Sequence, residues 1–235
     1  MVELIKDGIR LDGRKLDELR ELKTEINTSK EPAGSAMFRI GETFGIATVY
    51  GPMECHPRRL EDSARTVLDV NYAMMPFSTD ERNRPGFSRR NVEISAVIKR
   101  VFERVVFLED MPKTKITINI DILGADASTR CVAVNAVSLA LAHAGIPMRD
   151  LVSSCAVGKV SGELILDVAG KEDTEGDVDL PIAYMPLTDE LLLLQMDGVL
   201  KKDEYDKLLE MAKKGCKEIY EFQKKALIDF KSGSK

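Results

Sequence analysis

The chain has 235 residues, carries a net charge of −5 at pH 7, and is 44% hydrophobic and 31% charged. These values suit a soluble globular protein with a sizeable core, and the longest apolar runs are far too short to span a membrane. The negative net charge argues mildly against nucleic-acid binding, so any RNA contact would depend on local positive patches.

The first residues contain no apolar stretch of the kind found in a signal peptide. No cysteines are spaced as CxxC, and only His56 and His143 are available as imidazole ligands, which argues against a zinc site. At this length a disulfide framework is equally disfavoured, so we expect buried free thiols in a cytoplasmic protein. The four cysteines are Cys55, Cys131, Cys155 and Cys216.

The first half of the chain predicts short strands followed by a polar loop. Strands are expected over 38–40 and 45–50, joined by a turn at Gly41, and a further strand over 65–75. Residues 78–90 are polar and contain proline and glycine, so they should form an exposed loop.

The middle of the chain carries the clearest periodicities. Apolar residues repeat at spacings of three and four over 91–106, which predicts an amphipathic helix. Isoleucines alternate with polar residues over 115–122, which predicts a strand buried on one face. An alanine-rich segment over 130–144 predicts a helix buried on most sides and ended by Gly145.

The last third predicts a hairpin, two more strands and a long helix. The hairpin covers 151–160 and 164–168, the strands cover 177–184 and 191–196, and the amphipathic helix covers 203–230. No low-complexity linker divides the chain, and runs of strands followed by helices favour an α+β fold.

A candidate anion site lies at Gly124–Arg130, between the isoleucine-rich strand and the alanine-rich helix. The first N–H groups of a helix lack intrahelical partners and attract anions, but Ser128 or Thr129 could simply cap the helix. For these two residues alone, capping is the favoured interpretation. A cation at Arg130 opposes the helix dipole, which makes a phosphate at this turn more plausible.

A second candidate is the acidic run Glu172–Asp179, in which five of eight residues are acidic. It is either a solvated loop or a site, because Asp177 and Asp179 alternate with apolar residues of an expected strand. A turn at Gly176 would bring Asp173 near Asp179. Close carboxylates share a proton or a cation, and Mg²⁺ or Mn²⁺ suits oxygen ligands.

A third candidate is basic. Residues 80–104 contain seven Lys or Arg and four Asp or Glu, a local balance of +3. Arg82, Arg84, Arg89 and Arg90 lie in the expected loop, and Arg100 and Arg104 lie on the following helix. Arginine side chains match phosphate oxygens, although ordinary solubilising charge explains a lone basic loop equally well. The pair Arg58 and Arg59 is similarly ambiguous.

Taken in order, six segments resemble the RNase PH family over nearly the full length. The resemblance implies an α+β RNase PH-type fold (ribosomal protein S5 domain 2-like), with mixed sheets packed with helices in one domain spanning 1–235. The segments are RLDGR (10–14), ATVYGP (47–52), RPGFSRRNVEIS (84–95), ADASTR (125–130), EDTEGDVDLP (172–181) and LLQMDG (193–198).

Within that family the chain most resembles the phosphorolytic ring subunit of archaeal exosomes. This implies a phosphate-dependent 3′-to-5′ exoribonuclease that releases nucleoside diphosphates from single-stranded RNA, reversibly, with inorganic phosphate as co-substrate. It also implies a hetero-hexameric ring with a non-catalytic RNase PH-like subunit, RNA-binding cap subunits and no membrane. Alternatives are a homohexameric RNase PH that trims tRNA 3′ ends, a non-catalytic RNA-binding ring subunit, and a chance coincidence of motifs.

The resemblance also implies roles for particular residues. Asp173 and Asp179 match the catalytic acids and would hold Mg²⁺ or Mn²⁺. The phosphate-binding turn corresponds to Ser128, Thr129 and Arg130.

The RNA-binding arginines of the family correspond to Arg89 and Arg90 beside the site, and to Arg58 at a channel constriction. One departure is that archaeal relatives commonly have Gly-Ser-Arg where this chain has Ser128-Thr129-Arg130. A side chain at position 128 would crowd the phosphate or add a hydroxyl donor to it.

Overall fold

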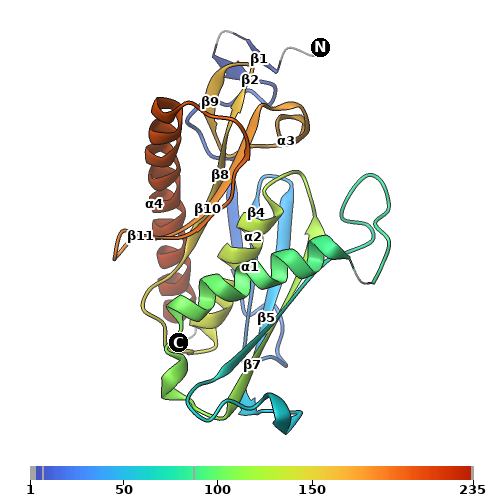
Figure 1. Ribbon diagram of the computed structural model, residues 1–235, viewed down its shortest axis with the longest axis vertical. Coiled ribbons are helices and arrows are strands. Elements are labelled where there is room, and N and C mark those ends of the chain that lie inside the picture. Colours follow the sequence, from blue (N-terminus) through green and yellow to red (C-terminus); the bar gives the residue numbers. More distant parts are fainter. Residues whose placement is uncertain (1–3, 7, 87, 234–235) are drawn as a thin grey trace.

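The computed structural model describes residues 4–6, 8–86 and 88–233, which form two five-stranded sheets, a two-stranded hairpin and several helices (Figure 1). In the first sheet the order is β3 (Leu22–Ile26), β4 (Gly34–Ile40), β5 (Thr43–Glu54), β7 (Thr114–Gly124) and β6 (Val67–Met74). In the second it is β11 (Glu190–Leu194), β10 (Val178–Met185), β8 (Ser153–Val160) and β9 (Glu163–Leu166), with β12 (Asp197–Gly198) also on β10.

The first sheet follows the predicted alternation. Along β7, Ile116, Ile118, Ile120 and Ile122 are fully buried while the residues between them face the other side. Strand β6 runs parallel to β7, because the helix α1 (Arg89–Val105) crosses between them, whereas the other pairings are antiparallel. The predicted strands and the 91–106 helix are confirmed, but α1 begins at Arg89, two residues earlier than expected.

Helix α2 (Thr129–His143) is buried along almost its whole length and contacts both sheets. Its alanines and valines explain this position, since only small side chains let a helix be covered on most sides. Helix α4 (Lys202–Gly233) lies along one side of the molecule against β8, β9 and β3 (Figure 1). Both the buried helix and the long amphipathic helix agree with their predictions.

The second sheet contains the predicted hairpin. Strands β8 and β9 pair antiparallel across Ser161 and Gly162, which both have positive φ, as a tight two-residue turn requires. The strand expected over 177–184 begins one residue later, at Val178. The four cysteines are free and buried, as expected, and His143 is structural, accepting a hydrogen bond from the Ser35 amide.

Several elements were not predicted. The short helix α3 (Lys171–Glu175) occupies the first half of the acidic run, and β1 (Ile5–Lys6), β2 (Ile9–Arg10), β3 and β12 are additional strands. In α3, Glu172 is only 4% exposed, because it forms an ion pair with the buried Arg10. The solvated-loop interpretation of the acidic run is therefore wrong for Glu172.

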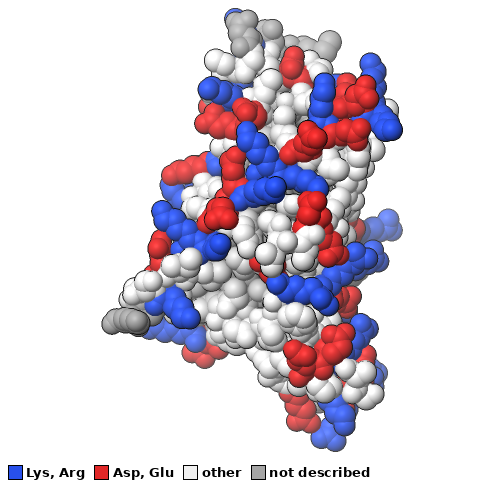
Figure 2. Space-filling view, turned by 90° about the vertical axis from the view of Figure 1, so that its left-hand side faces the viewer, with Lys and Arg blue, Asp and Glu red and all other residues white. Residues whose placement is uncertain are grey.

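Charged side chains of both signs intermingle on the face lined by α4, with no large patch of one sign (Figure 2). This face has none of the continuous positive charge that a strand of RNA would follow. Within the described part of the chain, no helix has the length and apolar character needed to cross a membrane.

Candidate active site

The first turns of α1 and α2 lie near α3 and near Val178, where β10 begins. Arg90, in the first turn of α1, donates from Nη2 to Thr129 Oγ1 at 3.4 Å. Arg130, the next residue of α2, is close enough to Asp179 on β10 to attract its carboxylate, and Asp173 on α3 repels that same carboxylate. Residues from α1, α3 and β10 thus converge near the first turn of α2.

The turn before α2 has an unusual backbone. Ala127 and Ser128 have φ values of 61° and 55°, in the left-handed region that costs non-glycine residues roughly 1–2 kcal/mol each. Ser128 stands at the N-cap, but its side chain makes no capping hydrogen bond and instead donates to the Val168 carbonyl at 2.9 Å. The capping interpretation is therefore wrong.

The start of α2 retains two free donors. Among the described residues, none accepts a hydrogen bond from the backbone N–H of Thr129 or of Arg130. Because the Ser128 hydroxyl proton is donated to Val168, this serine adds no donor at the turn. Two aligned N–H groups at the positive end of a 15-residue helix are a favourable place for an anion.

Arg130 is held beside this helix start by two neighbours. Its guanidinium donates to Gln195 Oε1, and its Nη2 lies 3.6 Å from Glu93 Oε2 on α1. Gln195 Nε2 in turn donates to Glu93 Oε1 at 3.0 Å. An anion at the helix start would compete with Glu93 for this arginine, because both carry negative charge.

Tyr72 on β6 adds a further polar atom. The residue is 3% exposed, and its hydroxyl lies beside the Thr129 side chain without a hydrogen bond of ordinary geometry to any described residue. Burial raises the pKa of Tyr72, while Thr129 and the positive charges of Arg90 and Arg130 act to lower it. A buried hydroxyl without a partner is costly, and such atoms often belong to a functional site.

The predicted acids come together. Burial raises the pKa of Asp179 to about 6, and repulsion from Asp173 and Asp197 adds to this, while Arg130 opposes it. Asp197 stands directly opposite Asp179, because β12 pairs with β10 at this position. A carboxyl group that titrates near neutral pH can exchange a proton during a reaction.

Gly198 makes the approach of β12 possible. A side-chain carbon at this position would lie 2.3 Å from the Asp177 carbonyl oxygen, and φ is +108°. Only glycine therefore fits, and without it Asp197 would not reach Asp179.

The acids fit a hard divalent cation only in part. The donors are all carboxylate oxygens, which suits Mg²⁺ or Mn²⁺, yet no group of three or more possible ligands is arranged as a metal site within the described residues. Mg²⁺ is commonly held by one or two carboxylates together with phosphate oxygens and water. A cation at Asp173 and Asp179 would therefore need further ligands from phosphate oxygens and water.

The remaining basic residues lie in different places. Arg89 is exposed in the first turn of α1, beside Arg90, rather than in the preceding loop. Arg58 is in a 3-10 helix (Arg58–Leu60) and pairs with the exposed Glu54 at 3.1 Å. The β5–β6 connection that contains it is at the opposite end of the molecule from α3 (Figure 1), so the fold separates Arg58 from the acids.

Four residues of this site were not singled out from the sequence. Gln195 and Asp197 lie inside the segment LLQMDG, and Glu93 lies inside RPGFSRRNVEIS, so the motifs contained them without indicating their roles. Tyr72 alternates with apolar residues in a buried strand, so nothing in the sequence pattern distinguished it as a functional residue. All four reach the site through tertiary contacts.

The fold and this site define a known class. Sequence profiles of the 3′ exoribonuclease family match residues 18–147 as domain 1 and residues 150–215 as domain 2. The chain therefore belongs to the 3′ exoribonuclease (RNase PH) family, which confirms the resemblance of its motifs.

Curated relatives are similar over nearly the whole chain. The exosome complex component Rrp41 of Pyrococcus abyssi is 49% identical over 94% of this chain and 89% of its own length. The protein of the same name from Methanopyrus kandleri is 48% identical over 94% and 93% of the two chains.

Solved structures confirm the expected RNase PH-type fold. The crystal structure of rice Rrp46 has a TM-score of 0.82 at 25% identity and covers 92% of this chain and 98% of its own. The Archaeoglobus fulgidus exosome with RNA bound to the active site gives a TM-score of 0.80 at 23% identity, covering 92% of each chain.

Proposed function

We propose that this chain is the phosphorolytic subunit of an exosome ring, degrading single-stranded RNA from its 3′ end and releasing nucleoside diphosphates. The observation that carries the proposal is the start of α2, where two free N–H groups and Arg130 adjoin a carboxyl group with a pKa of about 6. Membership of the 3′ exoribonuclease family and similarity to exosome components support the same activity.

Inorganic phosphate would bind at the N–H groups of Thr129 and Arg130, with the Arg130 guanidinium completing the site. Arg89 and Arg90 would hold the last phosphates of the RNA, because both lie in the first turn of α1 beside Thr129. An oxygen of the bound phosphate would attack the terminal phosphodiester. A new P–O bond would form as the bond to the leaving 3′ oxygen breaks.

The leaving 3′ oxygen needs a proton, and we assign its delivery to Asp179. A pKa of about 6 leaves a usable protonated fraction near neutral pH, which is the range that suits a general acid. Positioning and charge neutralisation by the arginines would supply most of the remaining rate. Because one phosphoryl linkage replaces another, the reverse reaction would extend RNA from nucleoside diphosphates.

Asp173 and Asp179 would hold Mg²⁺ or Mn²⁺, which would neutralise charge on the transferred phosphoryl group. This role uses ionised carboxylates, so it predicts the opposite pH dependence to proton donation by Asp179. The pH profile of kcat therefore separates the two roles.

The proposal includes an assembly. A hetero-hexameric ring with a non-catalytic RNase PH-like subunit, and RNA-binding caps on it, would place Arg58 at a constriction of the channel. That placement agrees with the separation of Arg58 from the acids, since a channel threads RNA past residues far from the reaction. One continuous core joins both sheets, which supports a single domain, and the buried thiols suit a reducing cytoplasm.

The test incubates the chain, alone and with its ring partner, with a 3′-tailed RNA and Mg²⁺, with and without phosphate. Nucleoside diphosphates that appear only with phosphate are the expected result, and dependence on the partner would select the exosome ring. An active homohexamer would instead support an RNase PH that trims tRNA. Monophosphates would indicate hydrolysis, and the absence of products would favour a non-catalytic ring subunit.

A further inference from the structure

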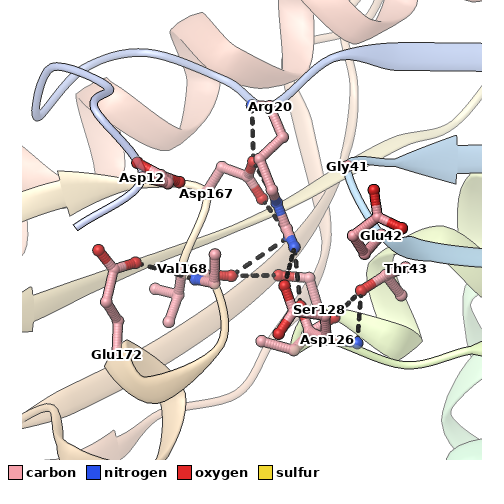
Figure 3. A network of polar contacts seen from close by, with 12 residues as sticks. Asp12, Arg20, Gly41, Glu42, Thr43, Asp126, Ser128, Asp167, Val168 and Glu172 are labelled. Carbon is pink, nitrogen blue, oxygen red and sulfur yellow. Dashed lines mark hydrogen bonds and ion pairs between the residues drawn. The ribbon is translucent and has the colours of Figure 1, made fainter. Parts of the chain in front are cut away.

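Arg20 connects two parts of the candidate site from outside it. The residue is 8% exposed and lies in the segment before β3. Its Nε donates to Asp167 Oδ2 at 2.8 Å and its Nη2 to Asp167 Oδ1 at 2.7 Å, a two-pronged ion pair. Its Nη1 donates to the Asp126 carbonyl at 2.7 Å (Figure 3). One guanidinium therefore bridges the end of β9 and the turn before α2.

The turn needs support because its backbone is strained. Ala127 and Ser128 are both left-handed, and no glycine is present to relieve the cost. Thr43 Oγ1 donates to the Ala127 carbonyl at 2.7 Å and accepts from the Asp126 amide at 2.9 Å. Arg20 and the Ser128–Val168 hydrogen bond hold the turn from the opposite side (Figure 3).

The other end of the bridge leads directly to α3. Asp167 is 1% exposed, and its neighbour Val168 accepts hydrogen bonds from both Ser128 and Arg20. Gly170, three residues after Asp167, is the N-cap of α3, and a side-chain carbon there would lie 3.1 Å from Asp126 Oδ1. The turn and the start of the helix therefore lie side by side.

Helix α3 is itself fixed to this segment. Glu172 accepts from Arg10 through both carboxylate oxygens and from the Ala169 amide at 3.0 Å. Arg10 also donates to the carbonyls of Leu166 and Asp167 at 2.6 and 2.7 Å. Glu172 directly precedes Asp173, so movement of the 166–172 segment would move that acid.

From this geometry we propose that Arg20 is a positioning residue that couples the phosphate-binding turn to the acid-bearing helix. The inference rests on the proposed function, which places phosphate at the turn and the metal-holding acid Asp173 on α3. A buried ion pair is a poor source of stability, since desolvation offsets most of its attraction. The planar guanidinium of Arg20 instead fixes the relative positions of three acceptor groups, which the single ammonium group of a lysine cannot do.

The test compares Arg20→Lys with Arg14→Lys in the assembled ring. Arg14 is a matched control because it is buried and donates to the same Asp167 carboxylate at 3.1 Å. It makes no contact with residues 126–128 among the interactions of the described chain. Both variants retain the positive charge, but only Arg20→Lys removes the bridge.

Two readouts are measured on each protein. The first is the KM for inorganic phosphate, which we expect Arg20→Lys to raise about tenfold with a smaller change in the KM for RNA. The second is amide hydrogen exchange, which should become faster in residues 126–130 and 170–175 together. Arg14→Lys should leave both readouts near wild type even if it lowers thermal stability equally.

The outcomes separate the coupling from the activity. Equal effects of the two lysine variants on phosphate KM and on exchange would overturn the coupling, because general loosening would then explain them. If the wild-type ring shows no phosphate-dependent products, the proposed function fails. Exchange would still decide the coupling in that case, since it needs no substrate. Faster exchange in only one of the two segments would also contradict the proposal.

Discussion

Asp179 and Asp197 face each other directly on the antiparallel strands β10 and β12. Like charges at opposed positions destabilise a strand pair, so this arrangement is not one that stability alone would favour. Burial raises the pKa of Asp179 to about 6, and repulsion from Asp173 and Asp197 adds to this. Asp197 therefore helps to keep the acid in the pH range in which it could donate a proton.

Replacing Asp197 should shift the pH profile of the enzyme. Asp197→Asn removes one repulsive charge, so the pKa of Asp179 should fall by about half a unit. If protonated Asp179 is required, the alkaline decline of kcat should move to lower pH by the same amount. Asp177→Asn is the control, because Asp177 is exposed and is not among the main causes of the Asp179 pKa shift. If the ionised form is needed instead, kcat should rise with pH through this pKa, and that acidic rise should move to lower pH in the variant.

Replacing Asp179 should separate stability from activity. The folded-state pKa of about 6 lies above the ordinary value of 3.8, so the stability due to the bound proton is present at low pH. It is lost as pH rises towards the folded-state pKa. Asp179→Asn cannot ionise, and we expect it to exceed wild type in unfolding free energy by about 1–2 kcal/mol at pH 8.

At pH 4 that difference should vanish, and phosphorolysis should be abolished at both pH values. Urea unfolding of the variant and of wild type at the two pH values measures the difference in unfolding free energy. A variant that is less stable than wild type at pH 8 would contradict the assigned cause of the pKa shift.

Tyr72→Phe should lower phosphate affinity without destabilising the fold. The hydroxyl is buried without a hydrogen bond, so its removal should leave the unfolding free energy unchanged or raise it by about 1 kcal/mol. Because the hydroxyl lies beside Thr129, binding of inorganic phosphate should weaken a few-fold. Calorimetry of phosphate binding and thermal unfolding provide the measurements.

Tyr220→Phe is the matched control for this change. Its hydroxyl donates to Asp150 Oδ1 at 3.0 Å, so the variant should lose about 1 kcal/mol of stability and retain phosphate binding. Loss of stability in Tyr72→Phe, with phosphate binding intact, would assign Tyr72 a structural role instead.

Glu93→Gln should strengthen phosphate binding. Glu93 pairs with Arg130 at 3.6 Å in a partly exposed position, so an anion at the turn must displace it. Removing this competition should lower the KM for phosphate about two- to threefold, in line with the modest energy of exposed ion pairs. Glu103→Gln is the control on the same helix, since the ion pair that Glu103 forms among the described residues is with Lys99, at 3.9 Å. An increased KM in Glu93→Gln would show that Glu93 orients Arg130 rather than competing for it.

Much of the fold could be predicted because it depends on local periodicity. The alternating isoleucines of β7 and the apolar spacing of α1 each satisfy one burial pattern, so their elements follow from neighbouring residues. The short elements could not be predicted in this way. Helix α3 and strand β12 exist because Arg10 pairs with Glu172 and because Gly198 permits close approach.

The candidate site, like the fold, could be predicted only in part from the sequence. The motifs by themselves indicated Asp173, Asp179 and the turn before α2, since those residues lie next to elements with clear patterns. The bond from Ser128 to Val168 and the approach of Tyr72 to Thr129 join residues 40 and 57 positions apart.

By itself, the sequence determined the family and the main elements and indicated the candidate acids, because local pattern and motif order are encoded in short segments. Only the tertiary structure decided that the Ser128 hydroxyl is not a cap, that Arg58 is remote from the acids and that Arg20 bridges the turn to α3. The physical reason is that hydrogen bonds and desolvation depend on which distant groups burial brings together, and no local pattern records those distances.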